Sequence, residues 1–136
     1  MQQLHDLNWA AVIVAALAGY FPGALWYSPV GFLRPWAREL GVDLDNPPGG
    51  KGVGLKVAIG IVPALTAAVI FALLLGHPVS LHHALMMAVA IAGGIIAPSF
   101  AVQYLYEHRG VTFWLINSGY HLLQFLIMAV VLSLWP

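Results

Sequence analysis

Four long apolar stretches dominate this sequence and limit what it can fold into. They lie at about residues 8–28, 55–75, 81–106 and 111–134, and a charged side chain occurs only near an edge, as with Lys56. A helix needs roughly 20 apolar residues to cross a hydrocarbon core of about 30 Å, and each stretch is long enough. An Asp, Lys or Arg at the centre of such a helix would cost about 2.5–3.5 kcal/mol. We therefore predict an all-α membrane protein built as a four-helix transmembrane bundle.

The composition supports lipid as the main solvent of this chain. Of its 136 residues, 61% are hydrophobic and 7% are charged, whereas an ordinary soluble domain is about 25% charged. So few charges cannot solvate the large surface of a small soluble fold, and we expect residues 1–136 to form a single integral membrane domain. The net charge is zero without a basic stripe, which argues against nucleic acid as a partner. The sequence has no cysteine, which excludes disulfides and thiolate chemistry.

The first apolar stretch could instead be a secretory signal peptide, because Ala16, Leu17 and Ala18 resemble a small-residue cleavage site. Residues 1–8 carry no Lys or Arg, however, and they contain Asp6. This is the reverse of the basic segment that begins a signal peptide. Apolar sequence also continues beyond the supposed cleavage site, so we interpret this stretch as a retained helix.

The basic residues predict how the helices are oriented in the membrane. Every Lys and Arg lies in or beside the first or the third loop: Arg34, Arg38, Lys51, Lys56 and Arg109. With four spans, these two loops share one side of the bilayer. The positive-inside rule then places loops 29–54 and 107–110 in the cytoplasm and both termini outside. We therefore predict a multi-pass protein of the cell membrane in this orientation. The alternative is that the five basic residues fall on one side by chance and do not indicate the orientation.

The first loop contains a predicted surface helix. Phe32, Trp36 and Leu40 are spaced four apart and predict a short helix near 32–40 with one apolar face. The arginines of this segment lie off that face. We expect the helix to lie in the membrane interface and to end at Gly41.

The other loop residues predict turns. Residues 46–50 are rich in proline and glycine, which is typical of a flexible connector. In the second loop, Gly76 and Pro78 interrupt the helices, and Ser80 can cap the helix that follows. Residues 107–109 predict a solvated turn.

Small residues recur every four positions along the first three spans. The stripes are Ala11, Ala15, Gly19 and Gly23; Gly60, Ala64, Ala68 and Ala72; and Ala84, Ala88 and Ala92. Because lipid provides little hydrophobic drive between helices, close approach along such stripes stabilises their packing. The fourth span has no comparable stripe, so we expect it to be peripheral to a core of the other three. We also expect kinks at Pro22, Pro63 and Pro98, and a homo-oligomeric assembly.

Polar residues within the spans form the strongest candidate site. Asn117 and His121 lie four apart and share one face of the fourth span. Ser99 and Gln103 share a face of the third span in the same way, and Tyr20 reaches a comparable depth on the first. We expect these five side chains to meet in one cluster, where His121 could relay protons because an imidazole titrates near neutral pH. The alternative is that they only hydrogen-bond neighbouring helices, at about 1 kcal/mol or less each.

A weaker candidate is a metal site at the start of the third span. His82 with Met86, and His83 with Met87, lie four apart, and imidazole with thioether suits copper ions. No carboxylate or thiolate completes the set, and the two pairs point in different directions. Polar caps at a helix start are the simpler interpretation. The sequence also lacks a phosphate-binding glycine loop and a nucleophile elbow, and we predict no cofactor.

Two motifs near opposite ends of the chain resemble a known family. The first is GALWYSP at residues 23–29, followed by Phe32, Arg34 and Trp36, and the second is INSGYHL at residues 116–122. Both are similar to motifs of the domain-of-unknown-function family 1761. The resemblance implies a small bacterial-type membrane protein with four helices, and it implies no activity, substrate or cofactor. It also marks as motif residues Trp26, Tyr27, Ser28, Pro29, Trp36, Asn117 and His121.

Two functional hypotheses follow from the polar residues. The first is a small channel or transporter for a solute or ion that uses the patch around Asn117 and His121, and it predicts a water-accessible cavity touching His121. The second is a structural or accessory subunit, and it predicts a dry cluster in which every polar group is paired. A membrane enzyme has little support, because one histidine without a nucleophile or carboxylate nearby is a poor catalytic constellation.

Overall fold

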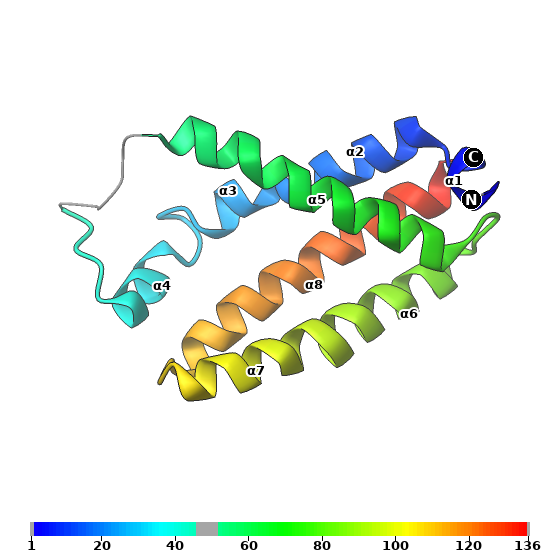
Figure 1. Ribbon diagram of the computed structural model, residues 1–136. Coiled ribbons are helices and arrows are strands. Elements are labelled where there is room, and N and C mark those ends of the chain that lie inside the picture. The colour runs from blue at the N-terminus through cyan, green and yellow to red at the C-terminus, as the bar shows by residue number, and fades with distance from the viewer. Residues whose placement is uncertain (1, 46–51, 136) are drawn as a thin grey trace.

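The computed structural model describes residues 2–45 and 52–135, and in these ranges the chain is helical and contains no strand. Four segments of the described chain are long and apolar enough to cross a membrane: Trp9–Trp26, Val53–Leu75, Leu81–Tyr106 and Val111–Leu134. They confirm the predicted four-helix transmembrane bundle to within two residues at each boundary. The elements, labelled in Figure 1, are α1 (Gln2–His5), α2 (Trp9–Tyr20), α3 (Pro22–Trp26), α4 (Leu33–Leu40), α5 (Val53–Leu75), α6 (Leu81–Ile91), η1 (Ala92–Ile96), α7 (Ala97–Tyr106) and α8 (Val111–Leu134).

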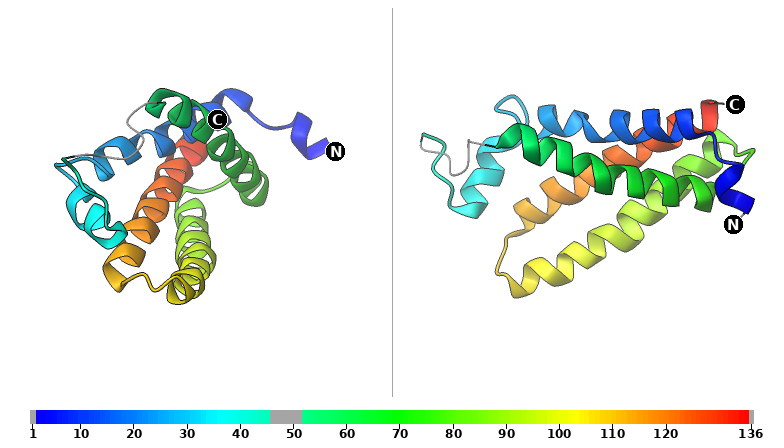
Figure 2. Two further views of the ribbon diagram at one scale, coloured as in Figure 1. Left: turned by 60° about the vertical axis from the view of Figure 1, so that its left-hand side comes forward. Right: turned by 45° about the horizontal axis from the view of Figure 1, so that its top comes forward.

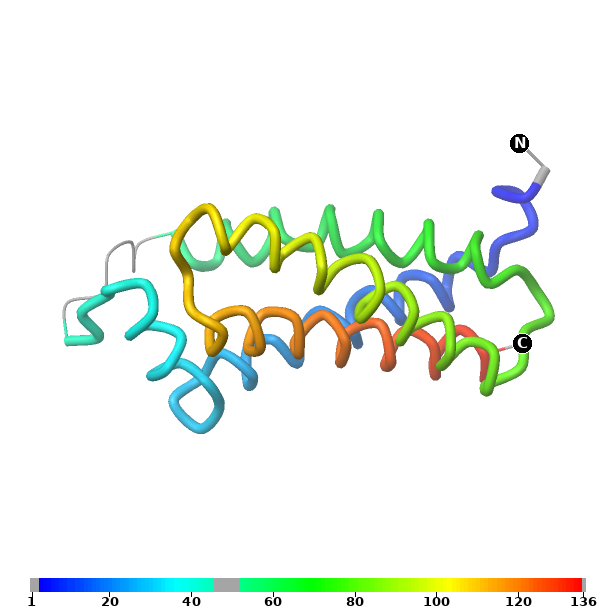
Figure 3. Tube along the Cα trace, turned by 90° about the horizontal axis from the view of Figure 1, so that it is seen from below, coloured from blue at the N-terminus to red at the C-terminus, as the bar shows by residue number. Residues whose placement is uncertain are grey.

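The four spans lie lengthwise beside one another and alternate in direction (Figures 1 and 2). Both termini and the turn between α5 and α6 lie at one end of the bundle, which we call the terminal end (Figure 3). Helix α4 and the turn between α7 and α8 lie at the opposite end, which we call the α4 end. The loops that carry the basic residues are therefore on one side of the bundle, as four spans require.

The first span is interrupted by a proline in its part nearer the α4 end. Helix α2 ends at Tyr20, and α3 begins with Pro22 in its first position. Proline is favoured there because the first amides of a helix have no intrahelical acceptor. The predicted interruption at Pro22 is thus present. Pro63, by contrast, lies inside α5, and the helix continues past it.

The third span contains an irregularity of a kind that the sequence did not indicate. Residues Ala92–Ile96 form a π-helical segment, η1, immediately before Pro98. Such widened turns are rare within α-helices. The carbonyl oxygen of Ile95, within this segment, accepts a hydrogen bond from Ser99 Oγ at 2.6 Å. We predicted a kink at Pro98, but the structure shows a π-helical turn just before this proline.

The prediction that the fourth span is peripheral was wrong. Helix α8 packs against both α2 and α6, and ten of its residues are buried, more than in any other described helix. The sequence argument considered only which helices can approach closely. The alanine faces of α2, α5 and α6 leave space between backbones, and bulky side chains of α8 fill it, such as Phe125 and the fully buried Met128. A helix without a small-residue stripe is therefore the partner that the stripes of α2 and α6 pack against, whereas the stripe of α5 packs against α2.

Two of the predicted loop features, the short helix and the Ser80 cap, are present in the described residues. The short helix is α4, and it ends at Gly41, whose φ of 68° is the left-handed conformation of a helix C-terminus. Ser80 caps α6, because its Oγ accepts a hydrogen bond from the backbone N–H of His83 at 3.2 Å. The predicted connector at residues 46–50 lies outside the described residues.

Candidate functional site: a polar and aromatic cluster at the α4 end

The side chain of Asn117 forms hydrogen bonds with residues from two other parts of the bundle. It is 9% exposed on α8, and its Oδ1 accepts a hydrogen bond of 2.6 Å from the Tyr27 hydroxyl, just after α3. Its Nδ2 donates to the hydroxyl oxygen of Tyr104 on α7 at 3.1 Å. A buried amide in an apolar medium needs partners for both ends. Asn117 has them from two different spans, so this one side chain connects the first, third and fourth spans.

The two motifs at the ends of the chain face each other across this cluster. The Trp26 Nε1–H donates to the backbone oxygen of Ile116 at 3.0 Å. The indole lies so close to α8 that a Cβ added at Gly119 would be 3.0 Å from Trp26 Cζ2, which explains the glycine in the second motif. The Tyr120 hydroxyl donates to the backbone oxygen of Tyr20 at 3.0 Å. The motifs therefore form one contact surface between the first and last spans.

Aromatic rings surround the Asn117 cluster. Trp36 of α4 lies edge-on to Tyr27, with ring centroids 5.7 Å apart, and stacks on Phe113 at 6.5 Å. Tyr104 packs edge-on against Phe113 at 4.9 Å. The apolar face of α4 thus packs on the bundle through Trp36, although the sequence predicted only that it would rest in the membrane interface. These rings make the surroundings of the Asn117 hydrogen bonds apolar.

Ser28 and Pro29 have local roles in the turn after α3. Ser28 Oγ donates to the backbone oxygen of Leu25 at 2.6 Å and accepts from the Gly31 N–H at 3.3 Å. Pro29 is exposed. This part of the first motif therefore shapes the chain reversal toward α4 and does not reach the cluster.

His121 lies one helical turn from Asn117 but has different partners. Its Nδ1 is 3.1 Å from Oε1 of Gln124 on the same helix. Its half-buried ring packs against Phe100 of α7 and against Tyr120, both with centroids 5.3 Å away. The imidazole is thus held between aromatic rings beside the cluster.

The remaining three predicted residues bond elsewhere. Ser99 bonds to its own helix, as described above, and Gln103 Nε2 donates to Glu107 Oε1 at 2.9 Å. The Tyr20 hydroxyl donates to the backbone oxygen of Val57 on α5 at 3.2 Å. The expected meeting of all five side chains is therefore not found.

Two tyrosines that were not part of the predicted polar cluster take the places expected for the other polar residues. Tyr27 and Tyr104 supply the hydroxyls that bond Asn117. The sequence did offer a signal for their role, namely the hydroxyl group of each tyrosine. A tyrosine near an interface still carries a hydroxyl that needs a partner when it is buried.

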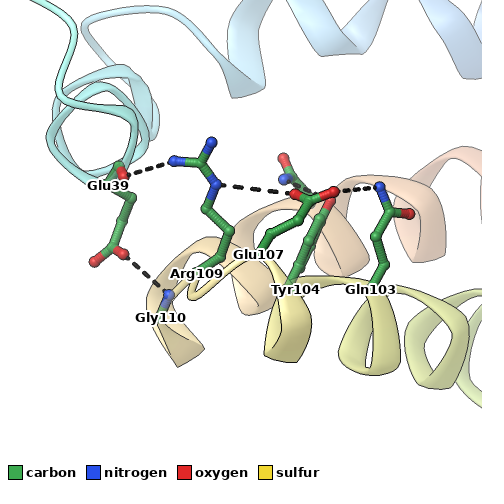
Figure 4. A network of polar contacts seen from close by, with 7 residues as sticks. Glu39, Gln103, Tyr104, Glu107, Arg109 and Gly110 are labelled. Carbon is green, nitrogen blue, oxygen red and sulfur yellow. Dashed lines mark hydrogen bonds and ion pairs between the residues drawn. The ribbon is translucent and has the colours of Figure 1, made fainter.

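A set of polar contacts fastens α4 to the turn between α7 and α8 (Figure 4). The backbone oxygen of Glu39 accepts from Arg109 Nη1 at 3.2 Å, and Glu39 Oε2 accepts from the Gly110 N–H at 3.3 Å. Arg109 Nε is also 4.0 Å from Glu107 Oε2, and the guanidinium lies 5.5 Å from the centre of the Phe113 ring. The turn predicted to be merely solvated is therefore a docking point for α4.

The histidine and methionine pairs of α6 lie at the terminal end. His82, His83 and Met86 are exposed, and Met87 is half-buried. Within residues 2–45 and 52–135, no group of three or more His, Cys, Asp or Glu side chains is arranged to hold a metal ion. The pairs thus stand apart from the Asn117 cluster.

Comparison with known proteins gives one match. A family model described as a protein of unknown function, DUF1761, matches residues 10–133. The comparisons with curated proteins and with solved structures found no match. The matched range includes both motifs and all but the outermost residues of the four spans.

Proposed function

Because the chain belongs to the DUF1761 family of proteins of unknown function, its role has to be argued from its geometry, and we propose a structural or accessory membrane subunit. In this role the polar residues inside the membrane fix how the helices pack and present a defined surface to a partner. The proposal is carried by the bonding of Asn117, whose amide is paired at both ends with tyrosine hydroxyls from other spans.

The energetics of the cluster support this role. Hydrogen bonds between membrane helices contribute on average about 0.6 kcal/mol and at most about 1.7 kcal/mol each. Two such bonds converge on Asn117, and Trp26 and Tyr120 add bonds to neighbouring backbone oxygens. Five grooves on the surface of the described residues have linings that include neither Asn117 nor His121. A polar path for a solute would instead leave such groups open to water.

A small channel or transporter is the second candidate, and His121 is the observation in its favour. The imidazole is half-buried within a span, and among the described residues a hydrogen bond engages only its Nδ1. A proton or small solute could use the other ring nitrogen. This hypothesis requires water to reach His121.

A flux experiment separates the two candidates. The purified full chain is reconstituted into liposomes, and leakage of protons and of rubidium ions is measured against empty liposomes, with His121→Ala in parallel. The accessory role predicts equal leakage from all three, together with a lower unfolding temperature for His121→Ala in detergent. Flux through the wild-type protein that His121→Ala abolishes without unfolding would instead establish the channel.

The accessory role requires a partner, and we propose that it binds the exposed face of α7. Ser99 and Gln103 lie on this face, and both are exposed. Polar side chains on membrane helices commonly bond across to a second helix. A second copy of the chain is the simplest partner, so Ser99→Cys should form disulfide-linked dimers in native membranes after mild oxidation. Val62→Cys, on the exposed side of α5, is the matched control, and equal cross-linking of both variants would contradict this arrangement.

We further propose that the α4 end faces the cytoplasm of a cell membrane. The support is charge, because the basic residues lie in or beside the loops at this end. The chain has no cysteine, so single substitutions can be labelled selectively. Gln3→Cys should react with a membrane-impermeant maleimide in intact cells, and Asp43→Cys should react only after lysis. The opposite pattern would reverse the orientation.

A further inference from the structure

A groove opens on the surface of the bundle between the first span, α5 and α8. It has a volume of about 270 Å³, and it is lined chiefly by Tyr20, Gly23, Ala24, Tyr27, Val57 and Tyr120. These residues belong to the half of the bundle nearer α4. Ala24 is exposed, and Val57 is 39% exposed, so the groove opens toward the surrounding lipid. Any occupant would therefore enter from the bilayer.

The three tyrosines make this groove apolar, because each hydroxyl is already bonded within the protein. The Tyr20 hydroxyl donates to the Val57 backbone oxygen, that of Tyr27 to Asn117, and that of Tyr120 to the Tyr20 backbone oxygen. The ring faces and small side chains remain to contact a ligand. Such a lining suits a hydrocarbon chain and offers little to a polar solute.

A glycine on α5 makes room for Tyr20, which lines the groove. A Cβ added at Gly60 would collide with the hydroxyl of Tyr20. The absence of that atom lets Tyr20 reach across to the α5 backbone, where its hydroxyl bonds Val57. The groove is thus formed by specific contacts between α2 and α5. Its volume is slightly below the roughly 300–1,000 Å³ of pockets for drug-sized ligands, which suits a segment of one acyl chain.

A lysine directly precedes Val57, the α5 residue that lines the groove. Lys56 is exposed in the first turn of α5, four residues before Gly60, so the two share a face of the helix. Helix side chains lean toward the N-terminus, and the N-terminus of α5 is at the α4 end. The ammonium can therefore extend to the level of the lipid headgroups. Among residues 2–45 and 52–135, no carboxylate pairs with Lys56.

From these observations we propose that the groove binds one acyl chain of an anionic phospholipid, whose phosphate pairs with Lys56. The tyrosine rings contact the acyl chain, and the lysine selects the headgroup by charge. A basic residue near the membrane surface favours anionic lipid by about 1 kcal/mol, which is about fivefold in affinity.

Native mass spectrometry of the full chain tests the proposal. The protein is released from micelles that contain phosphatidylglycerol and phosphatidylcholine with identical acyl chains. The wild-type chain should retain one phosphatidylglycerol at least about fivefold in preference to phosphatidylcholine. Lys56→Gln should remove this preference and keep the fold. Ala24→Leu should fill the groove and reduce retention of both lipids, whereas Ala90→Leu, on the exposed side of α6, should retain lipid as the wild type does.

Three results would overturn the proposal. They are equal retention of the two lipids by the wild type, a preference that survives in Lys56→Gln, and full retention by Ala24→Leu with an unchanged unfolding temperature. Each concerns a groove that neither Asn117 nor His121 lines. A negative result in the lipid-binding experiment would therefore not contradict the accessory role. Likewise, flux through the protein in liposomes would contradict the accessory role but not the lipid site.

Discussion

The two halves of the bundle are held together by different means. Toward the terminal end, the core consists largely of alanines from α2, α5 and α6 packed against α8, with Phe71 and Met128 as its largest fully buried side chains. Toward the α4 end, the side-chain hydrogen bonds between spans described above are concentrated, and aromatic rings surround them. One half is an apolar, alanine-rich core, and the other is a bonded polar network.

This difference follows from the solvent. Lipid tails are as apolar as the helix surfaces, so burial alone gives helices little reason to associate. Close approach of backbones is one solution, and it requires small side chains. Pairing of polar groups is the other, because an unpaired polar group in hydrocarbon is costly. The two halves should therefore fail in different ways, the first when volume is added and the second when a partner is removed.

Added volume at the terminal end should give the largest effect. Ala68 is 0% exposed in the alanine core, and Ala68→Leu would insert a bulky side chain where neighbouring backbones approach closely. Overpacking of this kind costs about 1–3 kcal/mol, and we expect the upper part of that range. The measurement is the free energy of unfolding in mixed micelles of mild detergent and dodecyl sulfate. Ala90→Leu makes the same change at an exposed site of the same half and should alter stability by less than about 0.5 kcal/mol.

Removal of a partner in the other half should give an intermediate effect. Asn117→Ala abolishes two hydrogen bonds and leaves the Tyr27 and Tyr104 hydroxyls without their partner. With each bond contributing about 0.6 kcal/mol on average, we expect a loss of about 1–2 kcal/mol in the same assay. Tyr27→Phe should cost less, and the double variant should be less destabilised than the sum by about 0.5 kcal/mol or more. Strict additivity would show that the 2.6 Å contact contributes nothing to stability.

The same comparison shows what the sequence could predict. The spans followed from length and from the absence of central charges, and the common side of the basic loops followed from the number of spans. Polar residues in the spans predicted a shared cluster, and of these Asn117 bonds to residues of two other spans. The first two predictions succeed because lipid imposes strong rules on single segments.

The predictions that failed all concern which surfaces meet. Nothing in α8 marks it as the centre of the bundle, because large side chains are equally suitable for facing lipid and for filling gaps between alanine faces. Ser99 and Gln103 lie at the expected spacing, but the rotation of α7 directs Tyr104 toward Asn117 instead. Rotation about a helix axis depends on all its neighbours together, and spacing within one helix does not determine it.

The contacts between α4 and the bundle should give a smaller and more local effect. Glu39→Ala removes the bond that Oε2 accepts from the Gly110 N–H but retains the backbone oxygen that accepts from Arg109. A part-buried hydrogen bond of this kind contributes about 0.5–1.5 kcal/mol. We expect faster amide hydrogen exchange in α4 and little change in the four spans. Asp43→Ala removes the same charge from an exposed position just after α4 and should leave exchange in α4 unchanged.

The smallest effect on stability is expected at Ser118, which is adjacent to Asn117. Ser118 is 9% exposed, like Asn117, but its hydroxyl is buried without a hydrogen-bond partner among the described residues. Removing a buried polar group that has no partner relieves its desolvation cost, so Ser118→Ala should be neutral or stabilising, within about 0.5 kcal/mol. The unfolding assay used for Asn117→Ala gives a direct comparison of adjacent positions. A loss for Ser118→Ala as large as that for Asn117→Ala would mean that packing of the motif, and not the pairing of its polar groups, holds this half of the bundle together.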